Sequence, residues 1–141
     1  MKADLEKAKN ILLKSKYTCV FCKDSIIITS FKRGINPLLD FLDSGVELSN
    51  FSCADKIVGK AAAFIYVLMG IKYVYAKVIS ESAKNILTRN GIQVDCNKTT
   101  KAILNRAHTG LCPMEQSVLD IDNSELALIA IRKRLSQLKN Q

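Results

Sequence analysis

Hydrophobic and polar positions follow two different periods along this chain, and together they predict an α/β protein. Apolar residues at helical spacing predict an amphipathic helix over Asp4–Lys14. Two short β-rich runs, Tyr17–Phe21 and Ile26–Phe31, predict strands joined by a turn at residues 22–25. Residues 36–42 are expected to form a short helix, because a proline stands in what would be its first turn.

The longest apolar stretch decides the prediction for the middle of the chain. Ser52–Met69 begins with an acid and two bases and continues as an almost wholly apolar run, which predicts one long, mostly buried helix. Ser52 would be its N-cap, Asp55 would complete a capping box, and Gly70 would end it. The polar end of such a helix must face something other than the core, so we expect it to open into a cleft.

The second half of the chain predicts strands that alternate with helices. Ile71–Ile79 is apolar on both faces, as a central strand requires. A helix over Ser80–Asn90 and a strand over Ile92–Cys96 follow, and a strand–helix–strand order implies a right-handed parallel crossover. Two further helices complete the prediction, at residues 113–120 and 123–138. The hairpin makes the sheet mixed, so the predicted fold is an α/β sandwich, a mixed β-sheet flanked by helices.

Composition narrows the class of protein. The chain has 141 residues, of which 48% are hydrophobic and 24% charged, so we expect one globular domain over residues 1–141. The longest apolar run, Ala61–Ile71, is shorter than the roughly 20 residues of a membrane span, and the charged N-terminus lacks the apolar core of a secretory signal. These features predict a cytoplasmic protein with no membrane partner.

The net charge of +8 bears on the choice of partner. The basic residues are spread along the chain, and the one run of three is residues 132–134, near the end of a predicted helix where cations are favoured. A solvated surface explains this pattern better than a nucleic-acid interface does, although nucleic acid stays open as a partner.

The number and spacing of the cysteines favour neither a disulfide framework nor a metal site. Their number is five, and an odd count in a chain without a secretory signal argues against a disulfide framework. Cys19 and Cys22 form a CxxC pair, but Cys19 falls inside a predicted strand, no second CxxC follows, and His108 is the sole histidine. We therefore expect no metal and no other cofactor, and we interpret these cysteines as buried or edge residues.

One candidate site is the polar start of the predicted long helix. Asp55, Lys56, Gly59 and Lys60 would share one quadrant of it. A glycine inside a helix costs about 1 kcal/mol relative to alanine, which is tolerated where something must approach the backbone closely. The functional interpretation is an anion pocket, built from two ammonium groups and the free N–H groups of a helix N-terminus. The alternative is Lys–Asp pairing at a solvated helix end, with Gly59 required only for packing.

A second candidate site is the segment around Cys112. The sequence TGLCPMEQ places this cysteine at the N-cap of a predicted helix, where a thiol is more readily ionised and Cys112 could act as a nucleophile. Glu115, three residues later, could cap the helix or act as an acid/base. The plain alternative is a small capping residue followed by an ordinary capping glutamate.

Three sequence strings resemble those of a known family. ADKIVGKAAA, VYAKVISESA and TGLCPMEQ are similar to strings in an uncharacterised domain-of-unknown-function family of small bacterial and archaeal proteins. The resemblance covers most of the chain, including GINPLLDFL at residues 34–42. It implies a cytidine-deaminase-like fold, in which a mixed sheet carries helices on its faces.

The resemblance does not imply deaminase chemistry. A zinc deaminase has a Cys or His, one further residue and a Glu at the N-terminus of one helix, and a Pro-Cys-x-x-Cys at the start of the next. Cys53-Ala54-Asp55 would occupy the first position and residues 80–84, which contain no cysteine, the second. Two of three zinc ligands are then missing, and the shorter Asp55 replaces the glutamate.

The leading functional hypothesis is a ligand-binding protein of deaminase-like fold without the zinc-deaminase residues. It would hold a small anionic or nucleotide-like molecule where the predicted helix end meets the turn that begins at Ser80. The first alternative is a non-zinc enzyme that uses Cys112, or Asp55 with Lys60. The second is an interaction or homo-oligomerisation module with the basic C-terminal helix at its interface. The predicted ligand contacts are Lys56, Gly59, Lys60, Ser80, Glu81 and Ser82, and the predicted catalytic residues are Asp55, Lys60, Cys112 and Glu115.

Overall fold

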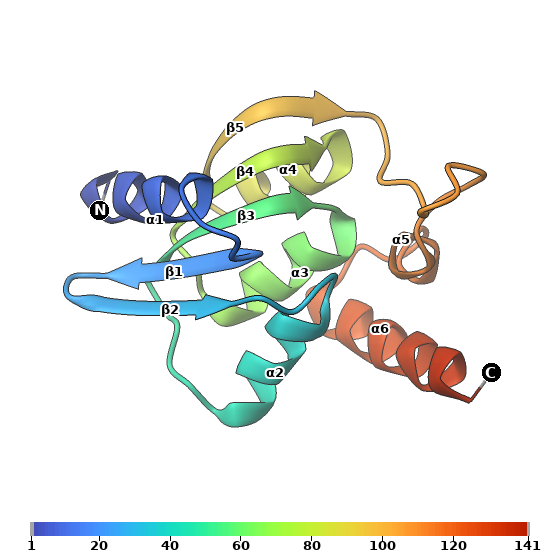
Figure 1. Ribbon diagram of the computed structural model, residues 1–141. Helices are drawn as coiled ribbons and strands as arrows, with labels where there is room; N and C mark the ends of the chain where they lie inside the picture. Colours follow the sequence, from blue (N-terminus) through green and yellow to red (C-terminus); the bar gives the residue numbers. More distant parts are fainter. Residues whose placement is uncertain (1, 141) are drawn as a thin grey trace.

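A mixed five-stranded sheet with helices on both faces forms the framework of the computed structural model, which describes residues 2–140 (Figure 1). The first half of the chain contains α1 (Lys2–Leu13), β1 (Cys19–Lys23), β2 (Ile26–Ser30), α2 (Asn36–Ser44) and β3 (Ser52–Val58). The second half contains α3 (Lys60–Met69), β4 (Tyr73–Ser80), α4 (Glu81–Arg89), β5 (Gln93–Thr100), α5 (Pro113–Ser117) and α6 (Ser124–Lys139).

The sheet combines a hairpin with two parallel crossovers. The strand order is β2-β1-β3-β4-β5. β1 is antiparallel to both β2 and β3, whereas β3, β4 and β5 are parallel to one another. The predicted mixed sheet is thus confirmed, and so is the parallel crossover between the strands now seen as β4 and β5.

The helices make a three-layer sandwich. On one face, α1 packs Leu5, Ala8 and Leu12 against Val20 of β1 and Tyr75 of β4. The larger core lies on the other face, where α3, α4 and α6 gather (Figure 1). The crossover helices α3 and α4 both cover this second face, as two successive right-handed crossovers require. Burial on both faces explains why the central strands are rich in apolar residues.

The prediction of one long helix over Ser52–Met69 is wrong for the first half of that segment. Ser52–Val58 is the central strand β3, and only Lys60–Met69 is helical. Ser52 is therefore not an N-cap, and Asp55 is not part of a capping box. The predicted element order lacked this strand, which lies between β1 and β4 and joins the antiparallel and parallel halves of the sheet.

Strand pairing, rather than local propensity, explains the difference. Residues 52–58 pair with β1 on one side and with β4 on the other. Gly59 is the single residue between β3 and α3, with an extended backbone at φ −100° and ψ −178°. Because no loop separates the strand from the helix, the apolar pattern runs through the boundary. The glycine that looked costly inside a helix marks the place where the helix begins.

The remaining boundaries agree with the sequence to within a few residues. α3 ends at Gly70, which adopts the left-handed conformation at φ +75° as expected. α4 begins after Ser80, whose side-chain oxygen accepts a hydrogen bond from the Ala83 N–H at 3.2 Å. β5 continues to Thr100 because its pairing with β4 extends that far. Within residues 2–140, no helix combines the length and apolarity that crossing a bilayer would require.

We predict that Tyr75→Phe leaves the protein equally stable or stabilises it by about 1 kcal/mol. Tyr75 is fully buried beneath α1, and its hydroxyl has no hydrogen-bond partner among the described residues. Removing the hydroxyl removes a desolvated polar group without opening a large cavity. Urea denaturation of the two proteins measures the difference. A loss of more than about 1 kcal/mol would contradict this account of the hydroxyl.

Candidate functional site

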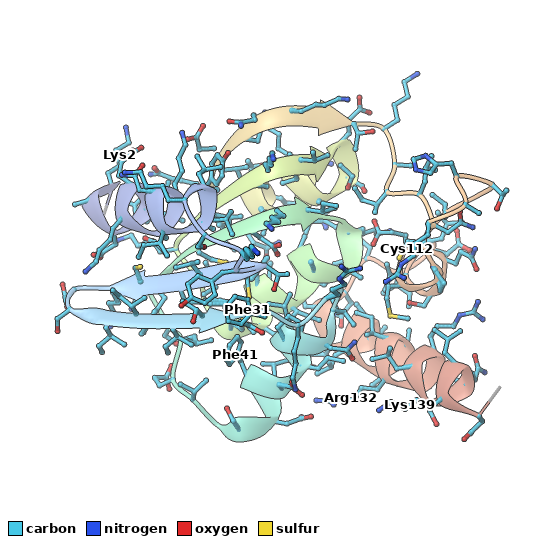
Figure 2. All side chains as sticks on the ribbon, in the orientation of Figure 1. Lys2, Phe31, Phe41, Cys112, Arg132 and Lys139 are labelled. Atoms are coloured by element: carbon cyan, nitrogen blue, oxygen red, sulfur yellow. The ribbon has the colours of Figure 1, made fainter. Side chains whose placement is uncertain are left out.

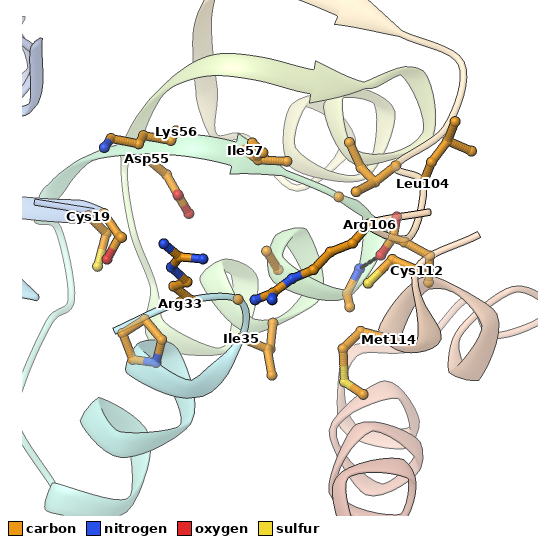
Figure 3. Close-up of a pocket in the computed structure, with 18 residues that line it drawn as sticks. Cys19, Arg33, Ile35, Asp55, Lys56, Ile57, Leu104, Arg106, Cys112 and Met114 are labelled. Carbon is orange, nitrogen blue, oxygen red and sulfur yellow. Dashed lines mark hydrogen bonds between the residues drawn. The ribbon is translucent and has the colours of Figure 1, made fainter. Parts of the chain in front are cut away.

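A cavity of about 410 Å³ opens beside the carboxyl end of β3 and the N-terminus of α3 (Figure 3). Because β1 is antiparallel to β3, the beginning of β1 lies at the same end of the sheet. The segment before α2 and the segment between β5 and α5 close the cavity from two further sides. Parts of the chain that are distant in sequence therefore meet here.

Most of the cavity wall is apolar. Side chains from four separate segments contribute to it, namely Ile35, Pro37, Ile57, Ala61, Ala62, Ile103, Leu104 and Met114. The cavity is open to solvent on one side, since Ile57, Leu104 and both arginines on its wall are exposed. The few charged groups that reach this space consequently decide what it can bind.

Two arginines extend into the cavity from different segments. Arg33 comes from the segment before α2 and Arg106 from the segment after β5, and Figure 3 shows their guanidinium groups directed toward the same space. Within residues 2–140, neither guanidinium has a hydrogen bond or a carboxylate at ion-pair distance. Two other arginines are paired with carboxylates: Arg89 binds Asp122, and Arg132 binds Asp43 at 2.7 Å.

Asp55 is the carboxylate at the β3 side of the cavity. Its Oδ2 accepts a hydrogen bond from the Tyr66 hydroxyl at 2.5 Å. Burial raises the pKa of Asp55 to about 6, although hydrogen bonds from Tyr66 and from two backbone N–H groups act in the opposite direction. This carboxyl group can therefore gain or lose a proton near neutral pH, as an acid/base requires.

Two thiols lie close to this carboxylate. Cys19 stands directly opposite Asp55 in the β1–β3 register, and Cys53 precedes it by two residues on the same strand. Burial, reinforced by the negative charge of Asp55, raises the pKa of both thiols. They are thus neutral packing residues, in agreement with the sequence-based interpretation of Cys19.

Glu115 occupies the N-terminus of α3. Its carboxylate accepts hydrogen bonds from the backbone N–H groups of Lys60, at 2.7 Å, and Ala61, at 2.9 Å. A Cβ atom on Gly59 would lie only 2.5 Å from Glu115 Oε1, so the predicted close approach to this glycine is confirmed. The expected free anion site at this helix end is instead filled by the protein's own carboxylate. Glu115 caps α3, not the helix on which it resides.

The other predicted members of this site are dispersed. Asp55 and Lys56 belong to a strand, and Gly59 is an N-cap, so these residues do not share a helix quadrant with Lys60. The Lys60 ammonium donates to the Leu119 carbonyl oxygen at 2.9 Å and is absent from the cavity wall. The predicted pairing of Lys60 with Asp55 is therefore not formed, whereas Lys56 does line the cavity.

The Ser80–Ser82 turn lies near the cavity but is not part of its wall. Val58 pairs with Ile79 in the parallel register, so the starts of α3 and α4 follow neighbouring positions in the sheet. Ser80 is committed to capping α4, and its Oγ lies 3.3 Å from the Ser82 Oγ. Neither these serines nor Glu81 is among the residues that line the cavity.

Cys112 stands at the N-cap of α5, as predicted, and it is half-buried at the cavity wall (Figure 2). Its side chain makes no capping hydrogen bond, and α5 is only five residues long. His108 is exposed and does not line the cavity. Nowhere between residues 2 and 140 do three His, Cys, Asp or Glu side chains group as metal ligands would.

The alignment of Cys53-Ala54-Asp55 with a deaminase helix start is also wrong. These residues lie inside β3, and the helix that follows begins with Lys60-Ala61-Ala62. No spacing rule in the sequence connected Arg33 with Arg106. The signal available was that each arginine lies in a segment with no predicted helix or strand.

We predict that Gly59→Ala destabilises the protein by about 1–3 kcal/mol. The added methyl group would push the Glu115 carboxylate from the Lys60 and Ala61 N–H groups, leaving charge-assisted hydrogen bonds unmade. Chemical denaturation of a double-mutant cycle with Glu115→Ala provides the measurement. The loss of folding free energy caused by Gly59→Ala should fall sharply in the Glu115→Ala background. Equal losses in both backgrounds would contradict the close contact between Gly59 and the Glu115 carboxylate.

Comparison with known proteins places the chain in a family. The model of the family described as "Domain of unknown function (DUF1893)" matches residues 7–135. The crystal structure of a DUF1893 family protein from Thermotoga maritima, at 2.70 Å resolution, is similar with a TM-score of 0.83 and 28% sequence identity. That similarity covers 97% of this chain and 91% of the other.

A second solved structure shows a weaker similarity. It is a dCMP deaminase from the cyanophage S-TIM5 in its apo form, with a TM-score of 0.44 and 14% identity over 70% of this chain and 95% of that one. Among proteins with curated descriptions, none matches the sequence. The family match spans nearly the whole chain, and the chain therefore belongs to the DUF1893 family.

Proposed function

We propose that the cavity binds a small organic anion and that Arg33 and Arg106 hold its negatively charged group. The observation that carries the proposal is the convergence of two guanidinium groups, neither ion-paired within the described chain, on one cavity with apolar walls. A guanidinium presents a planar fork of donors that matches the oxygens of phosphate, sulfate or carboxylate. Two such groups favour a doubly charged anion.

The cavity also suits the organic part of such a ligand. Pockets for small molecules have volumes of about 300–1,000 Å³ and are mainly apolar with a few polar groups. The 410 Å³ cavity has this character. Asp55 offers an acceptor for ligand N–H or O–H groups at the β3 side. A nucleotide-like molecule, with an anionic group and a hydrogen-bonding ring, has both features.

The proposed ligand contacts thus differ from the first expectation. Lys56 keeps its place at the cavity wall, but Lys60 and the Ser80–Ser82 turn do not. The anion would bind through arginine side chains rather than through the α3 N-terminus, because Glu115 already occupies that end.

An enzyme that uses Asp55 as an acid/base is the second candidate. Its support is the position of Asp55 at the cavity wall and the pKa of about 6 of its carboxyl group. The Tyr66 hydroxyl holds that carboxyl group in place by a hydrogen bond. In such an enzyme, the Asp55→Asn variant would still bind the substrate but would no longer turn it over. A binding protein would show no turnover in either form.

We predict that sulfate, phosphate and nucleoside monophosphates raise the melting temperature of the protein. A ligand at a hundredfold excess over its dissociation constant stabilises the folded state by about 2.7 kcal/mol. The double variant Arg33→Ala/Arg106→Ala should lose most of this stabilisation, and thermal melts at constant ionic strength measure it.

The control for this experiment is Lys84→Ala/Lys133→Ala, which removes the same amount of charge from exposed positions on α4 and α6. It should retain the stabilisation. If both double variants respond alike, the anions act on overall charge and the cavity is not a binding site.

We predict that a bound anion slows alkylation of Cys112. This cysteine and Cys96 are the half-buried ones, whereas Cys19, Cys22 and Cys53 are buried. Because Cys112 lines the cavity and Cys96 does not, a ligand should protect only Cys112. Iodoacetamide labelling followed by peptide mass spectrometry compares the two within one sample. Equal protection of both cysteines, or of neither, would argue against occupancy of the cavity.

A further inference from the structure

We propose that the anion binds together with a proton, which Asp55 holds, so that the Asp55 carboxylic acid donates a hydrogen bond to the bound ligand. This inference rests on the proposed function, since it concerns an anion held by Arg33 and Arg106. It goes further because it names Asp55 as the group that makes anion affinity depend on pH and as a direct contact of the bound ligand.

The geometry brings like charges together. The Asp55 side chain extends from β3 toward the space into which Arg33 projects (Figure 3). An anion that bridges the two guanidinium groups would therefore lie in the same cavity as the carboxylate. Two negative charges in one cavity repel one another, which disfavours the charged form of the carboxyl group. A proton on Asp55 removes that repulsion and provides a hydrogen-bond donor in its place.

The carboxylate is arranged so that it can take this proton. Tyr66 donates to Oδ2 at 2.5 Å, which holds the carboxyl group in one orientation at the cavity wall. Burial has already raised the pKa of Asp55 to about 6 in the absence of ligand. A nearby anion shifts that pKa further upward, because it disfavours the charged form.

The groups around Asp55 do not compete for this proton. The residue opposite it on β4 is Ala76, which does not titrate. The Tyr66 hydroxyl and the Cys19 and Cys53 thiols have pKa values raised by burial, so they stay neutral. The carboxylate of Glu115 is bound to two backbone N–H groups. The remaining charged neighbours at the cavity wall are cations, namely Arg33, Lys56 and Arg106.

The sign of the pH dependence follows from this linkage. Below about pH 6, Asp55 is protonated before the ligand arrives, and binding is strongest. As the pH rises through the pKa of the free protein, binding must take up a proton, and the affinity falls. The fall is about tenfold for each pKa unit by which the bound anion raises the pKa of Asp55.

Sulfate is the probe for the test, because it remains a dianion between about pH 5 and pH 8 and contributes no titration of its own. Its dissociation constant is measured by thermal shift and by intrinsic fluorescence across this range at constant ionic strength. We expect the wild-type affinity to fall about tenfold or more from the acidic to the alkaline end. Asp55→Asn, which is neutral at every pH, should bind sulfate with an affinity that varies less than about twofold.

Two variants serve as matched controls. Asp120→Asn removes an exposed carboxylate outside the cavity, and His108→Gln removes the imidazole near Arg106 in the sequence. Both should retain the wild-type pH dependence. Should Asp55→Asn fail to fold, proton uptake by the wild-type protein on addition of sulfate near pH 7, recorded in a pH-stat, tests the same point. Uptake approaching one proton per bound sulfate supports the inference.

The two proposals fail in different ways. Sulfate binding that requires Arg33 and Arg106 but shows the same pH dependence in wild type and Asp55→Asn would overturn the proton coupling and leave the binding site intact. Binding without proton uptake would do the same. If sulfate binding does not depend on the two arginines, the proposed function fails and the proton coupling fails with it.

Discussion

The contact between the Glu115 carboxylate and the N-terminus of α3 holds the two halves of the cavity together. The carboxylate lies directly against Gly59 and satisfies two backbone N–H groups that the helix itself leaves without partners. It joins α5, which follows the segment carrying Arg106, to the junction between β3 and α3. A charged acceptor at a helix N-terminus is favoured both by hydrogen bonding and by the helix dipole. Since no side chain can intervene at Gly59, the two segments come within reach of one another.

The consequence of this contact is that the helix end at the cavity wall already has a carboxylate bound to its N–H groups. A helix N-terminus beside a cavity normally attracts an anion from solution. Here the protein supplies that anion from within, and the cationic side chains that extend into the cavity are Arg33 and Arg106. Elsewhere on the molecule, Arg89 and Arg132 are bound to aspartates that neutralise them. The convergence of two guanidinium groups on one cavity, rather than the net charge of +8, therefore sets this cavity apart from the rest of the basic surface.

Asp55 shows how the sheet adjusts the chemistry of a side chain. Asp55 lies opposite Cys19 in the middle of the central strand and accepts a hydrogen bond from Tyr66, so its carboxylate is removed from most of the water that would stabilise its charge. The resulting pKa of about 6 makes the group responsive to whatever enters the cavity. The same carboxyl group on an exposed helix would have the ordinary pKa of an aspartate.

The sequence by itself determined those features that depend on local patterns. The N-terminal helix, the hairpin and the β4–α4–β5 crossover follow from periodicity and from turn and helix-end signals, which act within a few residues. The unusual glycine was also evident, because Gly59 interrupts an apolar run where a glycine is costly. Its close neighbour was expected, but the identity of that neighbour was not.

Tertiary structure alone decided the character of Ser52–Val58 and the composition of the cavity. Those residues form a strand because β1 and β4 offer backbone partners on both sides, and such partners are invisible to a local pattern. Glu115 reaches Gly59, and Arg33 comes to face Arg106, only because the chain returns to one end of the sheet after each crossover. Contacts between distant segments depend on how the whole chain packs, and no spacing within the sequence encodes them.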